Sequence, residues 1–302
     1  MNEKVYDMLI VGGGPGDYTA ALYAARAGLG VLVLEKLAAG GQMAETPQID
    51  NYPGYTGLDG FTLGQQMKEG AEKFGAQSRF AEVTKLHLEG EIKSVDTTDG
   101  VFYGKTVVVA TGAHPRKLNV PGEQALYGRG VHYCAACDGM FYRGKTVAVV
   151  GGGNTAAAAV SVLSRVASKV LLVHRRDTLR ASGVYHKPLQ GLPNVEFHWN
   201  ATVKEIRQGE IAIENTISGE TQVLPCDGVF VSVGRQPETS LVAGLLHLDE
   251  QGYITADEST RTNIPGVYAV GDVRAKGLRQ IVTAVADGAT AVHYAEEYLA
   301  TQ

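Results

Sequence analysis

The same order of apolar and polar positions occurs twice in the chain. Residues 7–36 and residues 145–176 each begin with an apolar run rich in β-branched side chains and continue into a glycine cluster. An alanine-rich stretch and a second apolar run follow in both. Strand, tight turn, helix and second strand form a βαβ unit with parallel strands. The clusters at Gly12 and Gly151 are 139 residues apart, too far for one mononucleotide fold. The pattern therefore predicts an α/β protein with two Rossmann-like domains.

The residue that closes the second strand differs between the two units. Glu35 lies 23 residues after Gly12, and His174 lies 23 residues after Gly151. At this place a dinucleotide-binding unit meets the ribose of its ligand, and an acid accepts hydrogen bonds from a free diol. Glu35 therefore favours FAD or NAD in the first unit. An arginine pair after a strand is often only a solvated edge, but the second unit has a set of basic groups that suits the 2′-phosphate of NADPH: His174, Arg175, Arg176 and Arg180.

Two cysteines, spaced Cys134-Ala-Ala-Cys137, precede the second glycine cluster. This spacing brings two sulfurs within disulfide reach and can lower the pKa of one thiol, which is typical of a redox dithiol. Two alternatives are a structural zinc site, for which His132 and Cys226 would have to complete the ligand set, and a pair of inert buried cysteines. Asp138 follows directly, and it either carries a proton to or from a thiolate or is a charge at a helix N-terminus. We expect no bound metal.

Composition and charge narrow the class of protein. The chain has 302 residues, of which 44% are apolar and 20% charged, and its formal net charge is −5. This balance gives no electrostatic basis for binding nucleic acid or an anionic membrane, and no apolar run reaches the length of a membrane span. The N-terminus lacks signal-peptide features, and three cysteines are too few for a disulfide scaffold, so we expect a cytoplasmic protein. The 38 glycines exceed an average share, which indicates many special backbone positions.

Two dinucleotide-binding units with a CxxC motif between them resemble the low-molecular-weight thioredoxin reductases. The resemblance covers essentially the whole chain. It depends on motifs that follow the order of that family, at residues 12–20, 40–42, 49–54, 110–113, 133–139, 151–156, 174–180 and 271–281. It implies a discontinuous FAD-binding domain, residues 1–114 and 246–302, into which an NADPH-binding domain, residues 115–245, is inserted.

The resemblance also implies roles for single residues. Cys137 would face the flavin, Cys134 would attack the disulfide of thioredoxin or a related protein, and Asp138 would act as acid or base. The protein would act as a homodimer. The residues expected to contact FAD are Gly12, Gly14, Pro15, Glu35, Gly40, Gly41, Gln42, Asn51, Val83, Thr111, Gly112, Asp272, Arg279, Gln280 and Ile281. Those expected to contact NADPH are Gly151, Gly153, Asn154, Thr155, His174, Arg175, Arg176 and Arg180.

Two positions depart from the family pattern. Asp17 stands where the third glycine of the first fingerprint belongs, and that glycine permits close packing of helix against strand. A buried carboxylate there would repel the pyrophosphate, so we expect weakened FAD affinity; the alternative is that Asp17 turns into solvent. Relatives often carry acidic residues near positions 158 and 159, where this chain has Ala158 and Ala159. We derive no functional effect from that second difference.

Other functions remain open at this point. One is a related flavoprotein reductase that uses another electron donor, such as ferredoxin, or another dithiol partner. The basic set after the second unit disfavours ferredoxin-dependent reductases and small-molecule dithiol oxidases. A subunit of the alkyl hydroperoxide reductase type would need an extra N-terminal region. A non-catalytic flavoprotein that senses redox state or nucleotides is the alternative from a different class, and the CxxC motif with its following acid disfavours it.

Overall fold

The computed structural model describes residues 4–46, 48–55, 57 and 59–302. Residues 1–3, the start of the first predicted domain, lie outside the described residues. The chain forms two compact units: unit 1 consists of Met1–His114 and Gln236–Gln302, and unit 2 consists of Pro115–Arg235. Each unit contains a largely parallel sheet with helices, which confirms the predicted α/β class with two Rossmann-like units.

The chain returns to unit 1 at Gln236, ten residues earlier than the predicted boundary between residues 245 and 246. Packing explains the difference. Val242 is fully buried, and it lies in one apolar cluster with Leu9 and Val107 of the unit 1 sheet. Removing this segment from unit 1 would expose apolar surface, so it belongs there.

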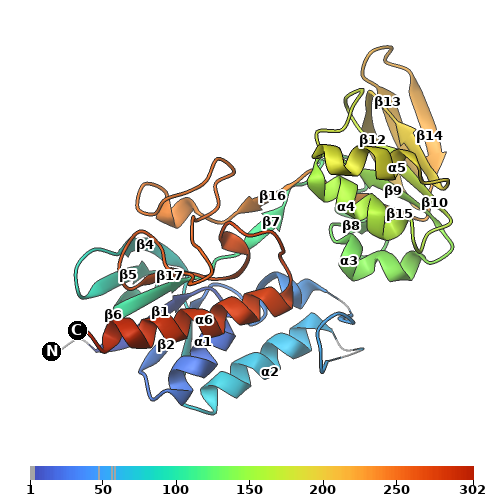
Figure 1. Ribbon diagram of the computed structural model, residues 1–302. Coiled ribbons are helices and arrows are strands. Elements are labelled where there is room, and N and C mark those ends of the chain that lie inside the picture. The colour runs from blue at the N-terminus through green and yellow to red at the C-terminus, as the bar shows by residue number, and fades with distance from the viewer. Residues whose placement is uncertain (1–3, 47, 56, 58) are drawn as a thin grey trace. The chain divides into compact units, whose positions relative to one another are not determined.

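Unit 1 is built on a seven-stranded sheet (Figure 1). Its parallel strands follow the order β3 (Gln77–Phe80), β2 (Val31–Glu35), β1 (Val5–Val11), β6 (Gly100–Val109) and β17 (Val267–Ala269). Two antiparallel strands extend the sheet beside the first half of β6: β5 (Lys93–Thr97) and β4 (Val83–His87). Strand β2 and the C-terminal halves of β1 and β6 are buried, as expected of parallel strands covered on both faces.

Three helices accompany this sheet: α1 (Pro15–Arg26), α2 (Gly60–Glu72) and α6 (Ile281–Leu299). α1 and α6 lie side by side in Figure 1, and their small side chains share one buried cluster with strand residues such as Ile10. The two helices approach so closely that a Cβ atom added to Gly288 would lie 2.3 Å from the carbonyl oxygen of Gly16. A larger side chain at either glycine would push the helices apart.

Unit 2 repeats the plan on a smaller scale. Its five-stranded parallel sheet has the order β11 (Val195–His198), β10 (Lys169–Val173), β9 (Thr146–Val150), β15 (Gly228–Val231) and β8 (Val131–His132). A separate antiparallel sheet consists of β12 (Ala201–Arg207), β13 (Glu210–Asn215) and β14 (Thr221–Pro225). The helices are α3 (Ala135–Asp138), α4 (Asn154–Leu163) and α5 (His186–Gln190).

Short elements complete the fold. The two segments where the chain crosses between units pair as strands, β7 (Ala113–Pro115) and β16 (Arg235–Pro237). The 3-10 turns are η1 (Gly41–Glu45), η2 (Gly139–Tyr142), η3 (Gly183–Tyr185), η4 (Ser240–Val242) and η5 (Gly271–Val273). In the described residues, no helix is both long enough and apolar enough to cross a membrane.

A buried ion network fastens the segment after β17 to α6. Asp287 of α6 accepts hydrogen bonds from Arg274 Nε at 2.9 Å and Nη2 at 2.8 Å, and from Lys276 Nζ at 2.7 Å. The three side chains are at most 8% exposed. The backbone N–H of Gly271 donates to Asp287 as well, at 2.9 Å. The network thus fixes η5, which carries the predicted FAD contact Asp272.

We predict that Asp287→Asn lowers the free energy of unfolding by about 3–5 kcal/mol, because it leaves two buried cations without their counter-charge. Burial alone would raise the pKa of Asp287, but Arg274 and Lys276 hold it below its usual value. The larger free energy of unfolding of wild type relative to D287N is therefore fully present above pH ~4. It disappears as the pH falls through the lowered pKa of Asp287. Urea unfolding of both proteins at several pH values measures this. The exposed acid Glu250, changed to Gln, is the control, and equal stability of D287N and wild type at pH 7 would contradict the prediction.

Candidate active site

The first glycine turn joins β1 to α1 in a backbone conformation that needs glycine. Gly12 has a φ of 134°, and a Cβ atom there would lie 2.7 Å from the carbonyl oxygen of Ala110 at the end of β6. Pro15 occupies the start of α1, where its missing N–H costs nothing. The turn therefore brings backbone to the carboxyl ends of the parallel strands, the edge at which such sheets bind dinucleotides.

Glu35 ends β2 beside this turn and is 2% exposed. Its Oε1 accepts a hydrogen bond from Lys68 Nζ at 3.1 Å, whereas Oε2 is buried and has no hydrogen-bond partner among the described residues. Buried carboxylate oxygens are normally paired, so an unpaired one at this position fits an acid that accepts bonds from ribose hydroxyls. The site thus suits the unphosphorylated ribose of FAD.

Asp17 is buried, so the alternative in which it turns into solvent is wrong. It is 2% exposed, and its Oδ2 accepts a hydrogen bond from the N–H of Gly14 at 2.8 Å. Its Oδ1 is buried without a partner in the part of the chain that the structure describes, directly beside Gly12. Burial above all, together with the nearby charge of Glu35, raises the pKa of Asp17 well above its usual value. The Asp17 carboxyl thus accepts the hydrogen bond of the Gly14 N–H, which an anion bound at this turn would otherwise accept.

The other residues predicted to contact FAD lie on several elements of unit 1. Gly40 donates its N–H to Gly13 O at 2.7 Å, which holds η1 against the glycine turn. Gln42 Nε2 donates to Ala113 O, and Asn51 Nδ2 donates to Gln280 Oε1 at 3.0 Å. Thr111 Oγ1 donates to Glu238 O at 2.6 Å, next to Gly112. The bonds of Asn51 and Thr111 tie the N-terminal segment to the segment that returns after the insertion.

Four further members of the predicted FAD set are Asp272, Arg279, Ile281 and Val83. Arg279 donates to Asp272 O at 3.4 Å, and its guanidinium lies 3.9 Å from the ring centroid of Tyr253. Ile281 begins α6, as predicted for a helix starting near that position. Val83 begins β4; the N–H of Ala81, two residues before it, donates to Glu35 O at 2.9 Å. Val83 is thereby placed beside the end of β2.

The second glycine turn repeats the geometry of the first. Gly151 has a φ of 147°, and a Cβ atom there would lie 2.3 Å from the carbonyl oxygen of Ser232 at the end of β15. Gly153 precedes α4, which starts with Asn154 and Thr155, and Ala156 fills the third fingerprint position and is fully buried. Ala158 is exposed and Ala159 is buried on the same helix.

The basic set divides into one buried and three exposed side chains. His174 is 4% exposed; its Nε2 has no hydrogen-bond partner among the residues described, and its ring fills the space beside Gly152. Burial, reinforced by the positive charges of Arg180, Arg175 and Arg176, lowers the pKa of His174, so the ring is neutral at pH 7. The arginines, not the histidine, are therefore the positively charged side chains of this set. Arg180 donates its N–H to Gly152 O at 2.7 Å.

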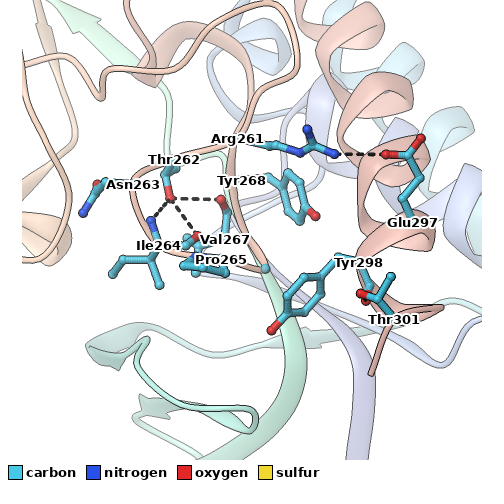
Figure 2. Close-up of a pocket in the computed structure, with 11 residues that line it drawn as sticks. Arg261, Thr262, Asn263, Ile264, Pro265, Val267, Tyr268, Glu297, Tyr298 and Thr301 are labelled. Carbon is cyan, nitrogen blue, oxygen red and sulfur yellow. Dashed lines mark hydrogen bonds and ion pairs between the residues drawn. The ribbon is translucent and has the colours of Figure 1, made fainter.

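A cavity of about 160 Å³ opens beside this basic set. Phe197 and Trp199 line it, with their rings stacked at a centroid distance of 5.0 Å. Flat aromatic surfaces next to a phosphate-binding set suit the adenine of NADPH. A larger cavity of about 470 Å³ lies between residues 261–268 and the end of α6, where Arg261 pairs with Glu297 (Figure 2). No predicted site residue lines it, so its position gives it no part in the predicted chemistry.

The cysteines of the CxxC motif form a disulfide. Cys134 is the N-cap of α3, Cys137 lies one turn later, and the Cα atoms are 5.3 Å apart. The N–H of Cys137 donates to Cys134 Sγ at 3.2 Å, a contact that favours a thiolate at Cys134 once the bond is reduced. Cys226 is buried in unit 2, and burial raises its pKa to about 12, so it stays an inert thiol.

Asp138 has neighbours that the sequence predictions missed. Its Oδ2 lies 3.1 Å from Nδ1 of His132, and Nε2 of His132 lies 2.8 Å from the hydroxyl of Tyr142. His132 was a candidate only as a zinc ligand. Because His132 lies two residues before the first cysteine, its position in the sequence could have indicated the contact with Asp138. The contact with Tyr142 could not be foreseen in this way, because Tyr142 reaches His132 through the turn η2. The dithiol site therefore contains a partly buried acid that contacts a buried imidazole, which in turn contacts a buried phenol.

Two βαβ units with glycine turns, and a disulfide whose cysteines lie between the two turns in the sequence, are typical of a nucleotide-dependent disulfide oxidoreductase. The family model of the pyridine nucleotide-disulphide oxidoreductases matches residues 6–288. The chain belongs to this family, which confirms the resemblance drawn from its motifs.

Thioredoxin reductases are among the most similar proteins. That of Listeria innocua is 43% identical, over 98% of this chain and 95% of the relative, and that of Bacillus subtilis is 42% identical, over 98% and 96%. The crystal structure of the Streptococcus pyogenes enzyme superposes with a TM-score of 0.92 at 44% identity, over 99% of both chains. The Giardia duodenalis enzyme superposes with a TM-score of 0.93 at 32% identity, over 99% and 100%.

We predict that Asp17→Gly increases FAD affinity at least about tenfold, because it removes a buried carboxyl that an anionic pyrophosphate meets. Since the pKa of Asp17 is raised, the group ionises as the pH rises, and wild-type FAD affinity falls with it. Asp17→Asn removes this pH dependence. The fluorescence of FAD released after dilution and desalting is measured from pH 5 to 9 for wild type, D17G and D17N. The surface change Asp99→Asn is the control. Tight, pH-independent FAD retention by wild type would refute the prediction.

Proposed function

We propose that this protein is an NADPH-dependent thioredoxin-disulfide reductase that uses FAD and the Cys134–Cys137 dithiol. One observation carries the proposal: unit 2 contains both a disulfide flanked by the acid Asp138 and a βαβ unit whose second strand, β10, is followed by exposed arginines. Unit 1 supplies the other βαβ unit, whose second strand, β2, ends in the acid Glu35. The relatives that match nearly the whole chain carry the name thioredoxin reductase, which supports thioredoxin as the substrate.

The chain's own groups bind and separate the two nucleotides. Glu35, with its unpaired buried oxygen, would hold the ribose hydroxyls of FAD, and the amides at Gly12–Gly14 and the start of α6 would face its anionic parts. Arg175, Arg176 and Arg180 would hold the 2′-phosphate of NADPH. When bound, FAD accepts a hydride from NADPH and passes two electrons to a disulfide.

The cysteines have distinct roles in the proposal. Cys137 faces the flavin, and Cys134 attacks the disulfide of thioredoxin, forming a mixed disulfide that Cys137 resolves. The N–H of Cys137 at Cys134 Sγ supports Cys134 as the nucleophile. Asp138 gives a proton to one sulfur when the disulfide opens and takes it back when the disulfide reforms. We further propose that the protein acts as a homodimer in the cytoplasm.

Anaerobic mixing with NADPH tests the proposal. We expect the flavin absorbance of the holoenzyme to bleach, and to return when oxidised thioredoxin is added, because the dithiol carries the electrons onward. The variants Cys134→Ser and Cys137→Ser should still bleach but fail to reduce thioredoxin. Bleaching of wild type without thioredoxin turnover would mean another dithiol partner. No bleaching would mean another electron donor or a protein that only binds nucleotides.

We predict that Arg175→Ala combined with Arg176→Ala raises the KM for NADPH about 10–100-fold, because two charge-assisted hydrogen bonds to the 2′-phosphate are lost. The KM for NADH, which lacks that phosphate, should stay the same. Steady-state kinetics with each nucleotide measures both values. Arg165→Ala removes an exposed charge of the same unit and is the matched control. A double variant that keeps the wild-type preference for NADPH would show that these arginines form only a solvated edge.

A further inference from the structure

His132 is fixed on the sheet of unit 2 directly before the CxxC motif. It lies on β8, which pairs parallel to β15 so that His132 is in register with Phe230. The residue is 7% exposed, and the Phe230 ring stacks on its imidazole at a centroid distance of 5.4 Å. A side chain held by the sheet and by an aromatic ring has little freedom to move away from its partners.

Both ring nitrogens of His132 are engaged. Nδ1 lies 3.1 Å from Asp138 Oδ2, and Nε2 lies 2.8 Å from the hydroxyl of Tyr142. A neutral imidazole has one donor and one acceptor nitrogen, and a carboxylate can only accept. The arrangement that satisfies all three groups has Nδ1–H donating to Asp138 and the phenol of Tyr142 donating to Nε2. The imidazole therefore supports the charged form of the Asp138 carboxyl.

Tyr142 is itself held as a donor. Burial above all, and the nearby charges of Asp138 and Asp227, raise its pKa, so its hydroxyl keeps its proton at neutral pH. Its ring meets the rings of His132 and Phe230 edge-on, at 5.3 and 5.4 Å. The ring occupies space that only glycine at position 228 leaves free, because a Cβ atom there would lie 2.2 Å from it.

We propose that His132 is a positioning residue of the dithiol site: from its place between Tyr142 and Asp138 it orients the Asp138 carboxyl and stabilises its carboxylate form. The proposal extends the proposed function, because it assigns Asp138 the proton transfer in that reaction.

The step balances as follows. Two electrons, which the reductase activity supplies from NADPH, enter the Cys134–Cys137 disulfide and break its S–S bond. One sulfur takes the proton of the Asp138 carboxyl, and the other remains a thiolate. The carboxylate that forms accepts the Nδ1–H of His132, which lowers the free energy of that state.

Several other charged or titratable side chains lie near Asp138, His132 and Tyr142 and could influence their protonation. Tyr142 on η2 and His132 on β8 are the contacts described above. Asp227 and Cys226 precede β15 and face Tyr142, and Lys145 Nζ lies 5.5 Å from the centroid of the Tyr142 ring. From α4, apolar side chains such as Leu163 meet the chain at Gly139. The variants that test the proposal leave Asp227, Cys226, Lys145 and Leu163 in place.

The test follows thiol protonation without NADPH or thioredoxin. The holoenzyme is reduced with dithiothreitol, alkylated with iodoacetamide from pH 5 to 10, and analysed by peptide mass spectrometry for Cys134 and Cys137. We expect an acidic inflection in the wild-type rate profile that Asp138→Asn abolishes. His132→Phe should raise the pH of that inflection by about one unit, because the carboxylate loses a charge-assisted hydrogen bond. At pH values between the wild-type and the variant inflection, the alkylation rates of the two proteins should therefore differ by up to about tenfold. His132→Gln keeps an N–H donor and should restore the wild-type position.

Control variants separate positioning from folding. His198→Gln changes another histidine of unit 2 that pairs with an acid, Glu196, and should leave the profile unchanged. Should H132F fail to fold, Tyr142→Phe leaves the imidazole in place without its donor, and it should move the inflection in the same direction.

Three results would overturn the proposal: an unchanged inflection in H132F, or in Y142F where H132F does not fold; equal displacement in H132F and H132Q; or an inflection that persists in D138N. Failure of the wild-type protein to reduce thioredoxin would contradict the proposed function instead, and the alkylation profile is measured independently of that result.

Discussion

Unit 1 is assembled from two segments of chain, and its fold requires that they meet in register after an insertion. Strand β17 pairs with the last residues of β6, and α6 packs on α1 where Gly288 faces the carbonyl of Gly16. The buried network around Asp287 then fastens the segment that joins β17 to α6. Because β17 and α6 both come after the insertion, α1, which follows the first glycine turn, is covered only when the chain has returned.

The insertion gives the protein two versions of one nucleotide-binding turn. Gly12 and Gly151 adopt the same left-handed backbone, and each lies against a carbonyl at the end of a neighbouring strand. The difference between the two units lies at the end of the second strand, where Glu35 offers an unpaired acceptor and His174 is followed by exposed arginines. We propose that one backbone conformation serves two nucleotides, and that the side chains at and just after the end of the second strand select between them.

The features predictable from the sequence are the local ones. The repeated βαβ pattern, the two glycine turns, the CxxC pair and the arginines after the second unit each occupy a short stretch, and their chemistry is visible in residue type and spacing. What packing decides was not predictable in this way. The burial of Asp17 depends on the fit of α1 against the strands, and the return at Gln236 depends on Val242 entering the core. His174 looked like a cation, but burial beside three arginines makes it neutral. The contact of His132 with Tyr142 needs the register of β8 on β15 and the turn η2 together.

The proposed reductase activity requires that electrons from NADPH reach the Cys134–Cys137 disulfide. Anaerobic incubation of the holoenzyme with NADPH, followed by alkylation under denaturing conditions and peptide mass spectrometry, measures this. Both cysteines should become alkylated after NADPH and remain in a disulfide without it, and Cys226 should be alkylated in both samples because it is a free thiol. If the disulfide persists while the flavin absorbance bleaches, the electrons leave the flavin by another route, and the proposed electron path is wrong.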